Sequence, residues 1–240
     1  YLSVIFGTGG ESVGGALWEV SLDGFIQNGL KNAHVLLEDS LRGFIAHPSW
    51  ADLNADGKED LIVPQHQGKF WALDIFNDQT IWQKDLKGYQ NYASPAIGNF
   101  TGDPTPDIYT TLARGVFPFY QEYVSILLDG SDGEIAWTDS TVDYYQLSQV
   151  NALDWDQDGW DEVLSSRVYF NQFEILDFND QALINIGEDR PGLNVFSTPF
   201  ITDLDQDQQL DIVFAFTPSV TRWSGNNGSR IERLEVPIAP

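Results

Sequence analysis

The sequence contains no cysteine and no methionine, and its 12 Lys and Arg residues are outnumbered by 36 Asp and Glu residues. The absence of cysteine excludes disulfide bonds, thiolate metal sites and a cysteine nucleophile. The formal net charge of −24 repels phosphate backbones and anionic membrane surfaces. We therefore expect no nucleic-acid partner, while the redox compartment stays open.

Long apolar runs are also missing. No run approaches the roughly 18 apolar residues that indicate a transmembrane helix, so we expect no membrane insertion. No signal peptide is recognisable either. Because residues 2–6 already have the composition of a strand, we expect the chain to be part of a longer or processed polypeptide or assembly. Aromatic residues make up 13% of the chain, which argues against disorder in spite of the charge.

Four acidic segments recur along the chain, beginning at Asp52, Asn99, Asp154 and Asp203. These starting points lie 47, 55 and 49 residues apart. Short segments rich in β-branched and aromatic residues follow each of them, which is typical of strands. A period near 50 residues with several short strands predicts propeller blades of four strands each.

The repeats predict an all-β fold, a β-propeller in a single domain over residues 1–240. The opening stretch fits the same unit without its first strand and acidic segment. The number of blades stays open, because the chain could close as a small propeller or form an arc of a larger one. The expected blade units are approximately 1–43, 44–88, 89–142, 143–192 and 193–240.

The acidic segments have oxygen-bearing side chains at alternate positions, in the pattern D-x-D-x-D-G-x-x-D. Ca²⁺ takes about six to eight oxygen ligands. Glycine at position six allows a sharp turn, position seven offers its backbone carbonyl, and the acid at position nine completes the shell. We expect three to four Ca²⁺ sites, with these ligands: Asp52, Asn54, Asp56, Lys58 and Asp60 in loop one; Asn99, Thr101, Asp103 and Asp107 in loop two; Asp154, Asp156, Asp158, Trp160 and Glu162 in loop three; Asp203, Asp205, Asp207, Gln209 and Asp211 in loop four.

Two of the four loops depart from the pattern. Loop two has only two carboxylates, with Pro104 in the glycine position, and loop four has Gln208 there. An EF-hand is excluded, because it requires a bidentate Glu at position twelve and flanking helices. The alternative is a set of solvated acidic turns, since Asp, Asn and Gly favour turns without any metal.

The loops, each followed by short strands, resemble the FG-GAP (VCBS-type) repeats of integrin α-subunit propellers and many bacterial surface proteins. Residues 68–74 with Trp82, and residues 124–133 with Trp137, resemble the PQQ-like repeats of the outer-membrane assembly lipoprotein and the quinoprotein dehydrogenases. The resemblance implies a propeller whose blades begin with an inner strand followed by the metal loop. Quinoprotein enzymes carry a vicinal disulfide over their cofactor, and this chain has no cysteine, so we expect no PQQ.

Catalytic motifs are absent from the sequence. The three histidines, His34, His47 and His66, share no metal-ligand spacing, and no G-x-S-x-G is present. Ca²⁺ in the acidic loops would be structural, because no base or nucleophile accompanies it there. We expect no enzymatic activity and assign no catalytic residue.

Aromatic residues near the expected strand starts are candidate binding residues. The polar residue before the aligned start of an inner strand, such as His47, is expected at one mouth of the central channel. The connection at residues 114–123 is long and aromatic. Such aromatics form a platform for protein or sugar, or they fill gaps between blades. The candidates are His47, Tyr92, Phe117, Phe119, Tyr120 and Tyr144.

These features together predict a non-enzymatic, calcium-binding propeller that serves as an interaction, adhesion or scaffold module. Millimolar extracellular Ca²⁺ suits loops of modest affinity, so we expect a secreted or cell-surface protein, with the periplasm as an alternative. The partner would be a protein or a surface glycan. A lectin-like propeller is one alternative function, and a polysaccharide-active enzyme with catalytic residues outside this segment is another.

Overall fold

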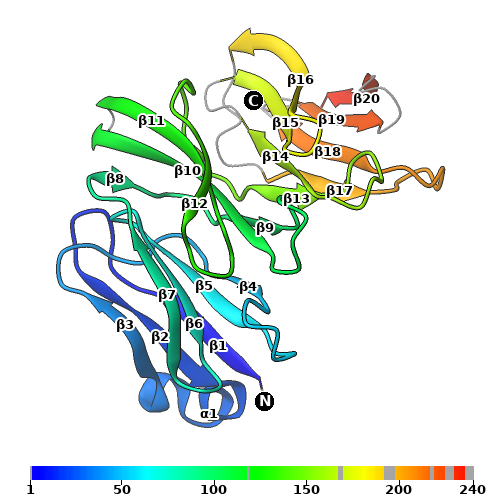
Figure 1. Ribbon diagram of the computed structural model, residues 1–240. Helices are drawn as coiled ribbons and strands as arrows, with labels where there is room; N and C mark the ends of the chain where they lie inside the picture. The colour runs from blue at the N-terminus through cyan, green and yellow to red at the C-terminus, as the bar shows by residue number, and fades with distance from the viewer. Residues whose placement is uncertain are drawn as a thin grey trace.

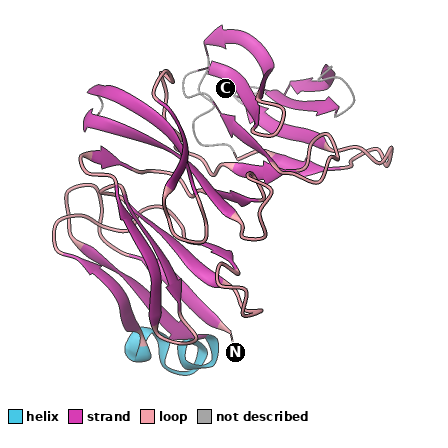
Figure 2. Cartoon of the chain, viewed as in Figure 1, coloured by secondary structure: helices cyan, strands magenta, loops and turns pink. Residues whose placement is uncertain are grey.

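The chain folds into five antiparallel sheets that follow one another in sequence order around an arc (Figure 1, Figure 2). The computed structural model describes residues 2–117, 119–166, 170–191, 198–216, 219–224 and 230–235. Sheets A to E contain, respectively, β1 (Ser3–Gly7), β2 (Gly15–Ser21) and β3 (His34–Asp39); β4 (Ser49–Ala51), β5 (Asp60–Gln65), β6 (Lys69–Asp74) and β7 (Gln79–Asp85); β8 (Tyr89–Gln90), β9 (Ala96–Gly98), β10 (Asp107–Val116), β11 (Phe119–Leu128) and β12 (Ile135–Asp139); β13 (Asn151–Leu153), β14 (Glu162–Ser166), β15 (Phe170–Asp177) and β16 (Ala182–Pro191); β17 (Phe200–Thr202), β18 (Asp211–Phe216), β19 (Ser219–Ser224) and β20 (Arg230–Glu235).

Within each sheet, strands that are consecutive in the chain pair with one another, except that β8 and β9 of sheet C both pair with β10. Sheets B to E each have a three-residue strand that precedes the acidic loop, and of these β4, β9 and β13 lie next to one another. We call β4, β9, β13 and β17 the inner strands. Each of the five sheets falls within one of the expected blade units. The expectation of an all-β propeller architecture is confirmed, and the ends of units four and five include residues outside the described part of the chain.

A separate hydrophobic core fills each gap between consecutive sheets. The strands that follow the acidic loops, which we call the second strands, contribute to the cores on both sides of their sheet. Their successive side chains point to opposite faces of the sheet. In β5, Leu61 packs in the A–B core and Ile62 in the B–C core. In β10, Ile108 packs in the B–C core and Tyr109 in the C–D core. The D–E core contains Leu153, Leu164, Phe173, Ile175 and Ile212.

Helix is scarce in the described residues. Helix α1 (Leu22–Asn28) and the 3-10 turn η1 (Gly29–Asn32) join β2 to β3. The Ser21 hydroxyl caps α1 by accepting a hydrogen bond from the backbone N–H of Gly24 at 3.1 Å. No helix in the described part of the chain has the length and apolar character needed to span a bilayer.

The two ends of the second strands carry different residues. The acidic loops precede β5, β10, β14 and β18 and therefore lie at one end of the sheets. The turns that follow β5 and β10, and the linkers between sheets, lie at the opposite end. The hairpin β10–β11 has ten-residue strands, longer than the six-residue strands β5 and β6, and a register shift at Arg114 and Gly115. The fold thus separates the candidate metal loops from the candidate aromatic residues.

Candidate metal centres

Loops one, three and four share one hydrogen-bonding scheme. In loop one the backbone N–H of Gly57 donates to Asp52 Oδ2 at 2.9 Å, and that of Leu53 donates to Asp60 Oδ2 at 2.9 Å. The acids at positions one and nine are therefore held by backbone donors at opposite ends of the loop. The equivalent donors are Gly159 and Trp155 in loop three, and Gln208 and Leu204 in loop four.

The backbone of these three loops also follows one course. Position four has positive φ in each, at 58° for Ala55, 65° for Gln157 and 63° for Gln206. Position six also has positive φ. In loop one this residue is Gly57, with φ of 81°, whereas in loop four it is Gln208, with φ of 71°. A side chain in this left-handed region is strained. Loop four therefore reaches the same conformation as loop one at a conformational cost.

Acidic oxygens converge inside loops three and four, whereas the acids of loop one form no such group. In loop three, ligand atoms of Asp154, Asp156 and Glu162 lie within 4.8 Å of one another. Asp203, Asp205 and Asp211 form the equivalent group in loop four. These are positions one, three and nine of the pattern.

The carboxylates at position five are placed differently. The Asp158 side chain accepts hydrogen bonds from the N–H of Trp160 and from the Asn179 amide at 2.7 Å. The Asp207 side chain accepts from the N–H of Gln209, and neither acid belongs to the converging groups. In loop one, Asp56 forms an ion pair with Lys58 at 3.5 Å.

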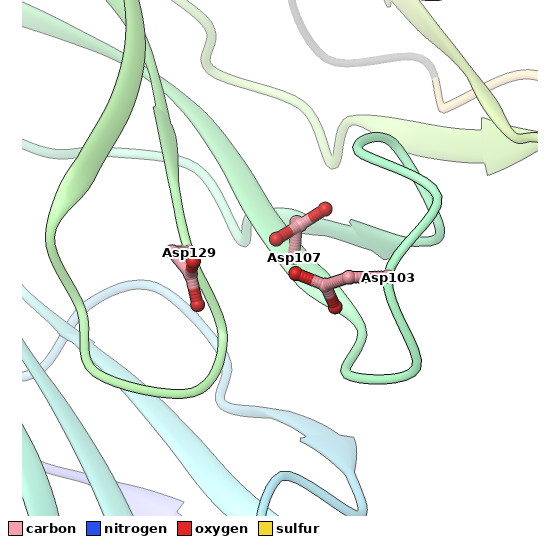
Figure 3. A group of neighbouring side chains, drawn as sticks. All are labelled: Asp103, Asp107 and Asp129. Carbon is pink, nitrogen blue, oxygen red and sulfur yellow. The ribbon is translucent and has the colours of Figure 1, made fainter.

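Loop two brings together a different set of acids (Figure 3). Asp103 and Asp107 converge with Asp129, which follows β11, and their ligand atoms lie within 4.8 Å. Thr101 donates its hydroxyl to Asp107 at 2.8 Å. Asn99 turns toward the neighbouring loop instead, donating its side-chain amide to the carbonyl of Gly159 at 3.2 Å.

In the described part of the chain, no Lys or Arg forms an ion pair with the acids of loop three. Burial, together with the nearby carboxylates of Asp156, Asp177 and Asp154, raises the pKa of Glu162 to about 7. Burial also raises the pKa of Asp60, with Asp74 and Asp52 adding to it. Adjacent carboxylates disfavour one another's ionised form. A divalent cation among them would remove this repulsion.

The donors fit a calcium ion. The side-chain oxygens are carboxylates, amides and hydroxyls, which are the hard donors that Ca²⁺ prefers over softer metals. In loop three, Asp154 Oδ1 is shielded from solvent and has no hydrogen-bond partner among the described residues. A buried carboxylate oxygen without a partner is costly. An ion at this position would satisfy that oxygen.

A set of aspartates at the ends of the third strands was not predicted from the sequence. Asp74 lies one position beyond the register pair Leu61–Leu73, directly across from Asp60. Asp129 and Asp177 occupy the equivalent positions across from Asp107 and Glu162. Asp177 and Asp180 converge with Asp156. The recurring spacing from Asp74 to Trp82 and from Asp129 to Trp137 was the available signal.

The candidate aromatic residues separate into exposed and buried groups. Phe117 and Phe119, at the tip of the β10–β11 hairpin, are 55% and 80% exposed. Tyr92 and Tyr120 are partly buried, and their hydroxyls lie within hydrogen-bond distance of each other and of Gln90 Oε1, so that the two phenolic protons serve two of these three contacts. His47 is exposed.

Tyr144 is buried between sheets C and D. Its hydroxyl contacts Ser165 Oγ at 3.2 Å and donates to a carboxylate oxygen of Glu174. The ring thereby fills the gap between two sheets, as in the gap-filling alternative. Its neighbour Tyr145 stacks on Tyr123 with 6.0 Å between ring centroids.

No family model matches the sequence, and no curated protein is similar to it in sequence. Solved structures do share its fold. BamB from Moraxella catarrhalis has a TM-score of 0.54 and 13% identity, over 97% of this chain and 68% of that chain. A europium-containing methanol dehydrogenase has a TM-score of 0.61 and 9% identity, over 98% of this chain and 49% of that chain.

A third similar structure is a complex, BBS1N with ARL6DN. Its TM-score is 0.55 at 12% identity, over 82% of this chain and 57% of that chain. The chain thus spans from about half to about two thirds of these three structures. The likeness to BamB and methanol dehydrogenase confirms the PQQ-like propeller fold, and the FG-GAP resemblance stays a prediction.

Proposed function

We propose that this chain is a non-enzymatic, calcium-binding β-propeller module that binds a protein partner in a calcium-rich compartment outside the cytoplasm. The observation that carries the proposal is the shared geometry of loops one, three and four. Each fixes acids at positions one and nine with backbone donors, and loops three and four gather three carboxylates each. Three copies of one geometry favour a common ligand over unrelated solvated turns.

The calcium ions would be structural. Each loop connects an inner strand to the second strand of its sheet, so an ion there would fix the junction of two strands. A site filled at about 100 times its dissociation constant adds roughly 2.7 kcal/mol of stability when the unfolded chain does not bind. In the apo protein the same carboxylates repel one another.

The proposal of a non-enzymatic role rests on the placement of the histidines. His66 is fully buried, and its ring nitrogens contact the Asn91 carbonyl at 2.9 Å and Arg42 Nη1 at 3.2 Å. The burial of His66 removes this ring as a base for a bound substrate. His34 is exposed and pairs with Glu19 at 3.2 Å.

The tip of the β10–β11 hairpin is the proposed protein-binding surface. Val116, Phe117 and Phe119 are 76%, 55% and 80% exposed, and they lie together at one turn. Exposed apolar clusters of this kind mark interaction sites. These three side chains carry no hydrogen-bonding group, which favours a protein partner over a glycan. The complex of the similar BBS1N with ARL6DN also supports a protein partner.

Thermal unfolding in millimolar Ca²⁺ and in excess chelator tests the metal proposal. We expect a rise of several degrees with Ca²⁺, reversed by chelator and not reproduced by Mg²⁺ at equal ionic strength. The double variant Asp154→Asn/Asp203→Asn should lose most of the rise, whereas the exposed Asp78→Asn should keep it. An equal melting temperature in Ca²⁺ and chelator would contradict the proposal.

A pull-down with the hairpin variant Phe117→Ser/Phe119→Ser tests the surface. A partner that binds the unaltered protein should be lost by this variant, while its calcium-dependent melting stays unchanged. Screening on immobilised glycans tests the lectin-like alternative. Specific glycan retention that survives the hairpin variant would replace the protein-binding proposal.

A further inference from the structure

A cavity of about 270 Å³ lies between sheets C and D, beside Tyr144. Strands β10, β11 and β12 contribute side chains to one wall, and β14, β15 and β16 contribute to the other. Residues 141–144 of the linker after β12 also line it. Neither the acidic loops nor the tip of the β10–β11 hairpin contributes a described residue to the lining. A ligand in this cavity would therefore be independent of both.

The repeat explains why there is space between these two sheets. Ser125 lies across from Thr111, four residues beyond Asp107, the acid that closes loop two. The equivalent residues of sheets B and D are Phe70 and Phe173, and each is fully buried in the core shared with the following sheet. A serine at the position of these phenylalanine rings leaves the C–D gap short of side-chain volume.

The hydroxyl of Ser125 has no partner inside this gap. The residue is 1% exposed, and its Oγ makes no hydrogen bond in the described part of the chain. Tyr109 is a polar neighbour of this oxygen, but the two hydroxyls do not reach hydrogen-bonding geometry. A hydroxyl donates one hydrogen bond and accepts two, and a buried one without a partner is costly. A ligand with a polar hydrogen would satisfy this oxygen.

Carboxylates form much of the polar lining. Asp139 on β12 lies directly across from Ser125. On the opposite wall, Glu174 occupies the position that Ile126 has in sheet C, because each pairs with the residue three positions beyond the acid that closes its loop. None of the described residues that line the cavity is Lys, Arg or His. A cleft lined by charges of one sign attracts the opposite sign, so this lining favours a cationic ligand.

Rings and aliphatic side chains form the rest of the wall. Tyr109 and Trp137 lie 6.4 Å apart between ring centroids, and Trp137 and Leu176 both pack against the C–D core. A quaternary ammonium suits aromatic surroundings, but it has no N–H for the oxygens of Ser125 and Asp139. A primary ammonium has three N–H donors, and its alkyl chain suits the apolar part of the wall.

We propose that this cavity binds a primary alkylammonium group. The ammonium donates hydrogen bonds to Ser125 Oγ and to the carboxylate of Asp139, and the negative charge of Glu174 attracts it from the opposite wall. The alkyl chain lies against Trp137 and Leu176. A free amine and a lysine side chain of a partner polypeptide share this chemistry.

An NMR titration with butylammonium tests the proposal. At pH 7.5 the amine is protonated, and millimolar Ca²⁺ at constant ionic strength keeps the amine from acting as a counter-ion in the acidic loops. We expect saturating shifts of the Trp137 indole N–H and the Ser125 amide, with a dissociation constant in the millimolar range. Butanol lacks the charge and butyltrimethylammonium lacks the N–H donors, so each should bind at least about tenfold more weakly. Equal shifts from all three compounds, or none from butylammonium, would overturn the proposal.

Variants of the lining separate this site from general attraction to an acidic protein. Ser125→Ala removes the hydroxyl and keeps the space, so the affinity should fall about tenfold while the melting temperature stays equal or rises. Asp139→Asn should weaken binding by a similar factor, and Asp78→Asn, outside the cavity, should not. Ser125→Phe fills the cavity as Phe70 and Phe173 fill theirs and should abolish binding. Unchanged affinity in both Ser125→Ala and Asp139→Asn would refute the site.

A second amine identifies the source of the group. Nα-acetyl-lysine methylamide carries the same ammonium on the side chain of an amino acid with both of its backbone ends blocked. Affinity equal to or above that of butylammonium would support the site and assign it to a lysine of a polypeptide. Binding of butylammonium alone would support the site and assign it to a free amine.

Discussion

Asp60 and Asp74 share one hydrogen-bond donor, the side-chain amide of Asn54, which lies 3.4 Å from the first and 3.3 Å from the second. Asp60 closes loop one, and Asp74 ends the neighbouring strand. Burial raises the pKa of Asp60, and the negative charge of Asp74 adds to this shift. The amide of Asn54 thus lies at a position where a cation would reduce the repulsion between the two carboxylates.

Replacing Asp74 by Asn should separate metal binding from apo stability. The variant removes a charge beside Asp60, but its amide nitrogen cannot accept the hydrogen bonds that Asp74 Oδ2 accepts from the side-chain amides of Asn54 and Asn77, so in chelator we expect a melting temperature at or below that of the unaltered protein. Asn retains an oxygen that can accept the hydrogen bonds now made by the N–H groups of Phe76 and Asn77. The calcium-induced rise should be smaller. Asp78→Asn is the control, and an unchanged calcium response in Asp74→Asn would remove Asp74 from the site.

Replacing Gln208 by Gly should stabilise the protein. Gln208 has φ of 71°, where a non-glycine residue costs about 1 kcal/mol or more. Urea unfolding in chelator should show a net gain of roughly 0.5 kcal/mol, because the entropy of glycine in the unfolded chain offsets about half of the relieved strain. The reciprocal change is Gly57→Ala. A Cβ added at Gly57 would have no heavy atom within 4 Å. The loss of stability in Gly57→Ala would therefore come from the backbone conformation alone. A loss of stability in Gln208→Gly would show that the loop geometry differs.

Trp82 joins sheets B and C through a single polar contact. Its Nε1 donates to the Gly130 carbonyl at 2.7 Å, and the ring is buried. Trp82→Phe leaves that carbonyl without its partner, which should cost about 1 to 3 kcal/mol in urea unfolding. Trp18→Phe is the matched control, because Trp18 Nε1 bonds at an exposed site. Equal effects of the two changes would contradict the role of Trp82.

His66 should make the stability depend on pH. Burial lowers the pKa of His66 below its ordinary 6.5, so the unfolded state takes up a proton first as the pH falls. The contribution of neutral His66 is present above about pH 6.5 and is lost below it. The difference in unfolding free energy between the unaltered protein and His66→Gln should therefore shrink from pH 7.5 to 5. A widening difference for His66→Gln would refute the assignment.

The metal loops could be located from the sequence because their interactions are local. Asp52 and Asp60 are held by backbone donors of the same loop, so a nine-residue pattern contains most of the geometry. Glycine at position six signals the positive φ that the turn requires. The departure at Asn99 was not visible, because its amide bonds to Gly159 in the next blade unit.

The aromatic residues show the limit of the same approach. Phe119 and Tyr144 both lie in aromatic stretches between expected strands, yet one is 80% and the other 5% exposed. The difference arises because the β10–β11 hairpin extends beyond its neighbours while the linker before β13 runs between two sheets. The stacking of the sheets decides which side chains fill the gaps between them. The composition of a stretch does not predict that stacking.

The sequence by itself determined the repeat, the all-β class and the position of the acidic loops, because period, alternation and turn residues act over a few neighbouring positions. Only the tertiary structure decided which residues meet across strands and sheets. It placed Asp74, Asp129 and Asp177 beside the loops and buried Tyr144. These relationships depend on strand register and sheet stacking, which bring together residues far apart in the chain.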